Sequence, residues 1–262
     1  MNFTAHPTAV ISPEAVLGEG TEVGPLAVIE SGVVIGRHCR IGAHAVIRGG
    51  TRMGDRNQVF EAAVLGGPPQ DLKYREAESY VQIGNDNVLR EGVTVHRATA
   101  PGGSTRIGDG CYLMAYAHVA HECVLGDQVI LANNVALAGH VEIGQGAFLS
   151  GGVVVHQFSR VGCGSMTGGN AKVEKDVLPY FLVDGVPART RGLNLVGLKR
   201  SGVSSDVLRE LKSAYRILFH QGGSLQQKMN ELRRLGSPQV TRLVEFIETS
   251  QRGFCRGARE RV

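Results

Sequence analysis

The chain has 262 residues, of which 36 are Gly and none is Trp, and its formal net charge is +4. Such a length can bury a real core, and many glycines with few aromatic rings favour a thin, turn-rich fold. No apolar stretch approaches the ~20 residues of a membrane span, and the N-terminus lacks a signal-peptide pattern, so we expect a cytoplasmic protein with no membrane span and no nucleic-acid partner.

A large aliphatic residue recurs at every sixth position from Ile11 to Val161, at 23 of 26 positions. A small or β-branched residue usually stands two positions earlier, and Gly often follows the aliphatic residue. An α-helix has no six-residue period, whereas hexapeptide repeats are typical of a parallel β-helix. We therefore predict a mainly β domain over residues 1–184, in which three short strands form each coil of about 18 residues and the aliphatic side chains fill a triangular prism.

The five cysteines include no CxxC pair, which suggests reduced thiols. Cys39, Cys111 and Cys123 occupy the small inward position of the repeat, so we interpret them as packing residues.

The repeat is interrupted near residues 66–79 and 98–105. The first interruption contains two prolines and several charged residues, and the second reads "ATAPGGST". Neither segment can form a regular coil, so we predict two loops that project from the prism. Inserted loops of this kind often carry function.

The composition changes near residue 185. Residues 185–262 carry 15 Lys+Arg and 6 Asp+Glu, a balance of +9, whereas residues 1–184 carry 13 and 18, a balance of −5. Apolar residues follow a helical spacing after Ser204, Ser224 and Ser237, each a candidate N-cap. We predict a linker and a C-terminal α-helical domain over residues 185–262, whose basic surface is either simply solvated or docks an acidic partner.

Four histidines of the second half avoid the inward positions and must face outward: His118, His121, His140 and His156. No insertion interrupts residues 107–161, so positions three repeats apart lie one coil above another. This places Gly139 over His121, and Gln157 over Gly139, in one patch. A flat prism wall makes a poor pocket alone, so we expect a homo-oligomer with sites between subunits.

Two chemistries suit such a cleft. A neutral imidazole can take a proton from a hydroxyl while nearby N–H groups stabilise an oxyanion, which is acyl transfer. Alternatively, imidazoles can hold zinc with an open position, as in a γ-type carbonic anhydrase-like enzyme that would use His118, His121 or His140. A purely structural solenoid would need flat repeated faces, which the irregular outward positions do not provide.

An ordered set of six motifs resembles the UDP-N-acetylglucosamine acyltransferases. The motifs are "GGPPQDLKY" (66–74), "VTVHR" (93–97), "AHVAHE" (117–122), "LANNVALAGH" (131–140), "VVHQF" (154–158) and "GLKRSG" (197–202). The resemblance extends from the N-terminus to about Arg256, and residues 257–262 lie beyond it.

The resemblance implies a left-handed β-helix that forms a homotrimer with intersubunit active sites. It implies transfer of an (R)-3-hydroxyacyl group from acyl carrier protein to the 3-hydroxyl of UDP-N-acetylglucosamine, the first step of lipid A biosynthesis. No cofactor is expected apart from the phosphopantetheine of the carrier protein. By the same resemblance, His121 is the general base and the backbone N–H of Gly139 stabilises the oxyanion.

The resemblance assigns further residues to the substrates. Asp71 and Lys73 are expected at the sugar, Gln70, His118 and His140 around the reaction centre, His156 and Gln157 at the diphosphate, Asn194 and Arg200 at the nucleotide, and Gly169 at the end of a long acyl chain. The basic candidates for docking the carrier protein are Lys199, Arg209, Lys212 and Arg216. Glu122 and Val196 depart from the Asp and Glu that the family commonly has at these positions.

Overall fold

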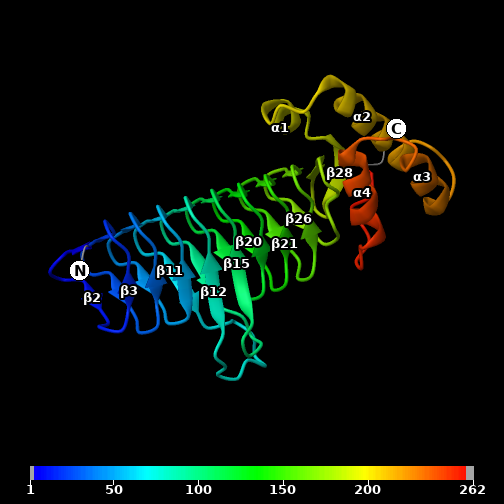
Figure 1. Ribbon diagram of the computed structural model, residues 1–262. Coiled ribbons are helices and arrows are strands. Elements are labelled where there is room, and N and C mark those ends of the chain that lie inside the picture. The colour runs from blue at the N-terminus through cyan, green and yellow to red at the C-terminus, as the bar shows by residue number, and fades with distance from the viewer. Residues whose placement is uncertain (1–2, 258–262) are drawn as a thin grey trace.

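The computed structural model describes residues 3–257 and shows a long three-sided prism with helices at one end (Figure 1). The prism is a left-handed parallel β-helix, as expected from the repeat and the resemblance. Each wall of the prism is one sheet, and successive strands along the chain pass to the next wall. All neighbouring strands pair in parallel, apart from the final hairpin.

The strands fall into three sheets. Sheet A contains β1 (Thr4–Ala5), β4 (Glu22–Val23), β7 (Arg40–Ile41), β10 (Gln58–Val59), β13 (Val88–Leu89), β16 (Tyr112–Leu113), β19 (Ile130–Leu131), β22 (Phe148–Leu149), β25 (Met166–Thr167), β27 (Phe181–Asp184) and β28 (Arg189–Leu193). Sheet B contains β2 (Val10–Ile11), β5 (Val28–Ile29), β8 (Val46–Ile47), β11 (Val64–Gly67), β14 (Thr94–His96), β17 (His118–Val119), β20 (Ala136–Leu137), β23 (Val154–Val155) and β26 (Lys172–Val173). Sheet C contains β3 (Val16–Leu17), β6 (Val34–Ile35), β9 (Thr51–Met53), β12 (Tyr80–Ile83), β15 (Ser104–Ile107), β18 (Val124–Leu125), β21 (Glu142–Ile143) and β24 (Arg160–Val161).

The aliphatic residues of the repeat fill the prism. Leu65, Leu113, Leu131, Leu137 and Leu149 are all fully buried, one above another or on facing walls. Cys39, Cys111 and Cys123 are also buried, which confirms that they are packing residues. Since each coil covers the edges of its neighbours, the stack provides one continuous apolar column.

Both inserted loops leave the prism at the corner between sheets B and C. The first joins β11 to β12 and the second joins β14 to β15. Leu65 pairs with Val95 across the first loop, and Val95 pairs with Val119 across the second. All three residues belong to the six-residue series of aliphatic positions, so each insertion adds whole repeats and the register continues on both sides of it.

Many corners are turned by residues with a left-handed backbone, and several of these residues are not glycine. Glu122, His140 and Phe158 occupy equivalent positions in three successive coils, with φ values of 54°, 59° and 63°. The backbone N–H of His140 donates to the carbonyl of His121, and that of Phe158 donates to the carbonyl of Gly139, at 3.0 and 3.1 Å. The three side chains consequently project from one corner in a vertical row.

The C-terminal helices are α1 (Leu195–Arg200), α2 (Ser205–Phe219), α3 (Leu225–Leu232) and α4 (Pro238–Glu248). Ser204 caps α2, Ser224 forms a capping box with Gln227 in α3, and Pro238 stands at the start of α4 after Ser237. Their apolar faces pack with Leu178 and Phe181 of the last coil into a second hydrophobic cluster.

Strand structure continues past residue 184, the predicted end of the β domain. The antiparallel partner of β27 is β28, which ends at Leu193. This strand falls in the segment predicted as a linker, because a hairpin breaks the six-residue period just as a linker does. Among residues 3–257, no helix is long and apolar enough to cross a membrane. Residues 258–262, most of the segment beyond the resemblance, lie outside the described residues.

Candidate active site

The predicted catalytic residues lie on the corner between sheets B and C, directly after the coils that carry the two loops. β17 pairs with β20 and β20 with β23, so these strands belong to three successive coils. His121, Gly139 and Gln157 follow these three strands at equivalent positions, so they stack as the repeat predicts.

A groove of about 420 Å³ opens beside this corner. Five residues that the sequence assigned to the site line it: Gln70, His118, His121, Gly139 and Gln157. Small and apolar residues form the rest of its surface: Ala120, Ala136, Leu137, Ala138, Val154 and Val155. Gln70 comes from the first inserted loop, so the loop and the prism wall share one groove.

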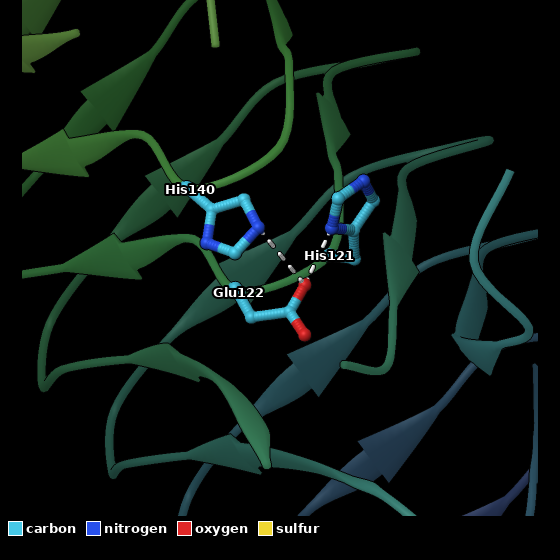
Figure 2. Close-up of side chains that lie close together, drawn as sticks. All are labelled: His121, Glu122 and His140. Carbon is cyan, nitrogen blue, oxygen red and sulfur yellow. Dashed lines mark hydrogen bonds and ion pairs between the residues drawn. The ribbon is translucent and has the colours of Figure 1, made fainter. Parts of the chain in front are cut away.

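Glu122 holds the ring of His121. Its Oε2 accepts a hydrogen bond from His121 Nδ1 (Figure 2), and both side chains are only 15% exposed. Its Oε1 accepts hydrogen bonds from the backbone N–H and the hydroxyl of Thr99, at 2.6 and 2.7 Å, and from the N–H of Ala100 at 3.1 Å. Burial raises the pKa of Glu122, but these hydrogen bonds outweigh it and bring the pKa below its ordinary value.

Ionised Glu122 fixes the tautomer of neutral His121. The carboxylate accepts only, so Nδ1 carries the proton and Nε2 is left as an acceptor. Thr99 belongs to the second inserted loop, and the sequence pattern does not predict its contact with Glu122. The sequence indicates only that Thr99 lies in a loop that leaves the prism near the histidines.

Gly139 lies too close to His121 to carry a side chain. A β-carbon at Gly139 would lie 2.3 Å from Cε1 and 2.6 Å from Nε2 of the imidazole. Within residues 3–257, the N–H of Gly139 donates to no acceptor. Gly139, whose N–H is unused, therefore lies against the ring edge that carries Cε1 and Nε2, the nitrogen that is free to accept a proton.

His118 lies in the same coil as His121, and His96 lies in the coil before it. His118 Nδ1 is 2.7 Å from the hydroxyl of Thr94, and the ring of His96 meets the ring of His118 edge-on with centroids 4.9 Å apart. Burial, followed by the charge of neighbouring histidines, lowers the pKa of both, that of His96 to about 4. His96 was not among the predicted site residues, although it stands in the "VTVHR" motif.

His140 completes the corner. Its Nε2 is 3.8 Å from Glu122 Oε2, and its ring stacks on Phe158 with centroids 4.6 Å apart. The donor atoms of His121, Glu122 and His140 lie within 4.8 Å of one another. Of the three histidines named for the zinc alternative, the fold brings His121 and His140 together with Glu122, whereas His118 does not belong to this group among the described residues.

The loop residues Asp71 and Lys73 form a tight turn beyond Gln70, in which the N–H of Lys73 donates to Asp71 Oδ1 at 2.8 Å. His156 is exposed, with its Nδ1 3.0 Å from the carbonyl of Gln157. Neither the turn nor His156 lines the groove of a single chain.

Asn194 and Arg200 lie at the two ends of α1, away from that groove. Asn194 is buried and has a structural role, because its Oδ1 accepts from the N–H of Gly197 and its Nδ2 donates to the carbonyl of Gly164. Arg200 is exposed in the last turn. Gly169 stands on the corner between sheets A and B, where a β-carbon would meet only the carbonyl of Gly151, at 3.6 Å.

The prism and the histidine corner define a class, the hexapeptide-repeat transferases. Residues 6–49 and 104–139 match the family described as "Bacterial transferase hexapeptide (six repeats)", and residues 176–255 match "Udp N-acetylglucosamine O-acyltransferase; Domain 2". The chain belongs to the UDP-N-acetylglucosamine O-acyltransferase family. The acyl-[acyl-carrier-protein]–UDP-N-acetylglucosamine O-acyltransferase of Alkalilimnicola ehrlichii is 51% identical over 253 residues, covering 95% of this chain and 98% of the relative.

Solved structures of UDP-N-acetylglucosamine acyltransferases have the same fold as this chain. The UDP-N-acetylglucosamine acyltransferase of Bacteroides fragilis has a TM-score of 0.93 at 38% identity, over 96% of this chain and 99% of its own. That of Francisella novicida has a TM-score of 0.94 at 34% identity, over 97% and 95%. The comparisons favour the acyltransferase over the zinc enzyme, and the chain is similar to these proteins from the prism through the helical domain.

Proposed function

We propose that this protein transfers an (R)-3-hydroxyacyl group from acyl carrier protein to the 3-hydroxyl of UDP-N-acetylglucosamine, the first step of lipid A biosynthesis. The observation that carries the proposal is the close approach of Gly139, whose N–H is unused, to the Cε1–Nε2 edge of His121 in a groove of small apolar residues. Family membership supports the donor and the acceptor, since the relatives are named for both.

The reaction follows from this geometry. His121 Nε2 accepts the proton of the sugar hydroxyl as the oxygen attacks the thioester carbonyl. The carbonyl oxygen becomes an oxyanion, to which the N–H of Gly139 donates. Collapse of the tetrahedral intermediate expels the phosphopantetheine thiolate, which takes the proton back from His121. Glu122 stabilises the imidazolium between the two steps and keeps the ring in place. No further cofactor takes part.

The other assigned residues bind the substrates. Gln70 and His118 line the groove at the reacting atoms, and His140 stands beside them. Asp71 and Lys73 bind the sugar from the first loop, and His156 and Gln157 bind the diphosphate. Arg200 binds the nucleotide from the end of α1, the helix that Asn194 caps and positions for this contact. Gly169 leaves space for a long acyl chain.

A homotrimer brings these dispersed residues together. The outward residues of the first four strands of sheet B form a column of valines, of which Val10 is 63% exposed and Val28, Val46 and Val64 are half-buried in the single chain. Exposed apolar columns of this kind mark protein interfaces. The enzyme acts in the cytoplasm, where its five unpaired cysteines stay reduced. The basic helical domain attracts the acidic carrier protein.

The test combines purified protein, UDP-N-acetylglucosamine and a series of 3-hydroxyacyl carrier proteins, with mass spectrometry of the product. We expect one O-acylated nucleotide sugar, and a loss of about 10²–10⁴-fold in rate for His121→Ala. His44→Ala, an exposed histidine on the same prism, serves as control. Light scattering should report three chains per particle for all variants. A His121→Ala trimer with undiminished transfer would exclude the mechanism.

A further inference from the structure

His121, Glu122 and His140 form what we call the His–Glu–His cluster. The atoms that face one another are His121 Nδ1, Glu122 Oε2 and His140 Nε2, and the two dashed lines in Figure 2 meet on the Glu122 oxygen. The farthest of them are within 4.8 Å, and Glu122 Oε2 lies 3.8 Å from His140 Nε2. Ligands around tetrahedral zinc stand roughly 3.3 Å apart at bond lengths of ~2.0–2.1 Å, so binding requires His140 to rotate toward Glu122 and the hydrogen-bonded atoms of His121 and Glu122 to move slightly apart.

The cluster is already held in place. Thr99 and Ala100 donate three hydrogen bonds to Glu122 Oε1, which leaves Oε2 directed at the imidazoles. Phe158 stacks on the ring of His140. Partners that orient metal ligands in this way raise metal affinity. The exposed fraction of the His140 side chain is 39%, so the cluster is accessible to solvent on the His140 side.

The donor set selects the metal. Two imidazole nitrogens and one carboxylate oxygen suit zinc, whereas magnesium and calcium prefer oxygen ligands alone. The length of Glu122 matters, because its carboxylate contacts His121 and also approaches His140 of the next coil. An Asp, the commoner residue in the family, is shorter by one methylene.

We propose that the His–Glu–His cluster binds one Zn²⁺ ion per chain and that this ion reversibly inhibits acyl transfer. Zinc on Nδ1 of neutral His121 displaces the ring proton from that nitrogen to Nε2, so Nε2 loses its capacity to accept the proton of the sugar hydroxyl. Zinc also takes the carboxylate of Glu122 away from the imidazole. The inhibition, though not the binding, rests on the proposed function.

The first experiment measures binding without substrates. Metal-free trimer is dialysed against ZnCl₂, and bound zinc is counted by mass spectrometry. We expect one zinc per chain, at least 10-fold weaker binding for Glu122→Gln and for His140→Gln, and weaker binding for Glu122→Asp. His44→Ala and Cys163→Ser, which alter a histidine and a half-exposed thiol outside the cluster, should bind as the parent does. Co²⁺ substitution should give the strong visible bands of a tetrahedral site, and excess Mg²⁺ should not compete.

The second experiment measures transfer at increasing zinc. Activity should fall in proportion to occupancy and return on adding EDTA, and whatever activity His140→Gln retains should resist the same zinc concentration. Equal binding by the parent and Glu122→Gln would assign the zinc to surface groups and overturn the proposal, as would full occupancy without inhibition. A metal-free enzyme with no transferase activity would contradict the proposed function instead, and the binding measurement would stand by itself.

Discussion

Gly139 and His121 share a space that has no room for another carbon. A methyl group at Gly139 would lie 2.3 Å from the imidazole, so Gly139→Ala must push the ring away from its hydrogen bond with Glu122. We expect kcat to fall by about 10²-fold, the cost of a misplacement near 1 Å, with the trimer intact. Gly192→Ala, where nothing lies within 4 Å of the new methyl, should keep its rate. An active Gly139→Ala would show that the ring position is not critical.

His96 makes stability depend on pH. Its pKa is lowered to about 4 from the ordinary 6.5, chiefly by burial. The unfolded chain therefore takes up a proton as pH falls through 6.5, whereas the folded chain does so only near 4, and stability is lost across that window. At pH 5 the loss is about 2 kcal/mol.

His96→Gln should remove this part of the pH dependence. Urea unfolding at pH 7.5 and pH 5 gives the free energy at each pH, and the difference should shrink by about 2 kcal/mol in the variant. His44→Gln, on an exposed corner, should leave the difference as it is. A parent and a His96→Gln variant with equal pH dependence would contradict the burial argument.

The repeat determines the positions of some site residues but not of others, and only the former could be predicted from the sequence. The stacking of His121, Gly139 and Gln157 could be predicted because an uninterrupted repeat converts sequence distance into vertical position. The hydrogen bonds from Thr99 to Glu122 could not be predicted, because the path of an inserted loop does not follow the six-residue period. The contacts that Asn194 makes as a helix cap depend on a hairpin that the sequence did not reveal.

At the scale of the coil, a buried polar row stabilises the corner between sheets C and A. Asn57 Oδ1 accepts from the N–H of Asn87, and Asn87 Oδ1 accepts from the N–H of Cys111, at 2.9 and 2.7 Å. Asn87→Ala leaves the buried N–H of Cys111 without a partner, which should cost about 2 kcal/mol in the free energy of unfolding. Asn85→Ala should cost less, because this side chain is partly exposed and water can replace its hydrogen bonds. Urea unfolding gives the free energy of unfolding of both variants. Equal losses would show that the burial of the Cys111 N–H does not set the cost.

The elements that the sequence missed are those without a sustained period. The hexapeptide rule predicted the prism strands, and the two insertions did not disturb it because they add whole repeats. The predicted N-caps Ser204 and Ser224 begin helices as expected. Helix α1 was not predicted, since six residues including a Gly hold too few turns to show a helical pattern.

At the scale of the molecule, Arg160 fastens the helical domain to the prism. From β24 its guanidinium lies over the ring of Phe246 at 4.2 Å and donates to the Phe246 carbonyl and the Thr249 hydroxyl. It also pairs with the carboxylate of Asp176, which is buried.

Arg160→Ala should loosen this junction. The buried carboxylate of Asp176 would lose its charged partner and keep only the hydrogen bonds from the Ser250 hydroxyl and the N–H of residue 160, which costs about 3 kcal/mol. Hydrogen exchange should therefore rise in residues 238–257 with little change in the coils before β21. Arg106→Ala removes an exposed arginine from the same sheet C column and should alter neither quantity. Unchanged exchange in α4 would mean that apolar packing alone holds the domain.

The prism also acts as a ruler. Each coil advances the chain by ~4.8 Å, and between Gly139 on one corner and Asn194 at α1 the protein inserts a fixed number of turns. The distance between the groove and α1 can therefore change only by whole coils, and a bound molecule that contacts both must match one of these distances. Inserting one complete coil between β23 and β24 would extend each wall by one strand and still put the two ends of such a ligand out of reach of each other.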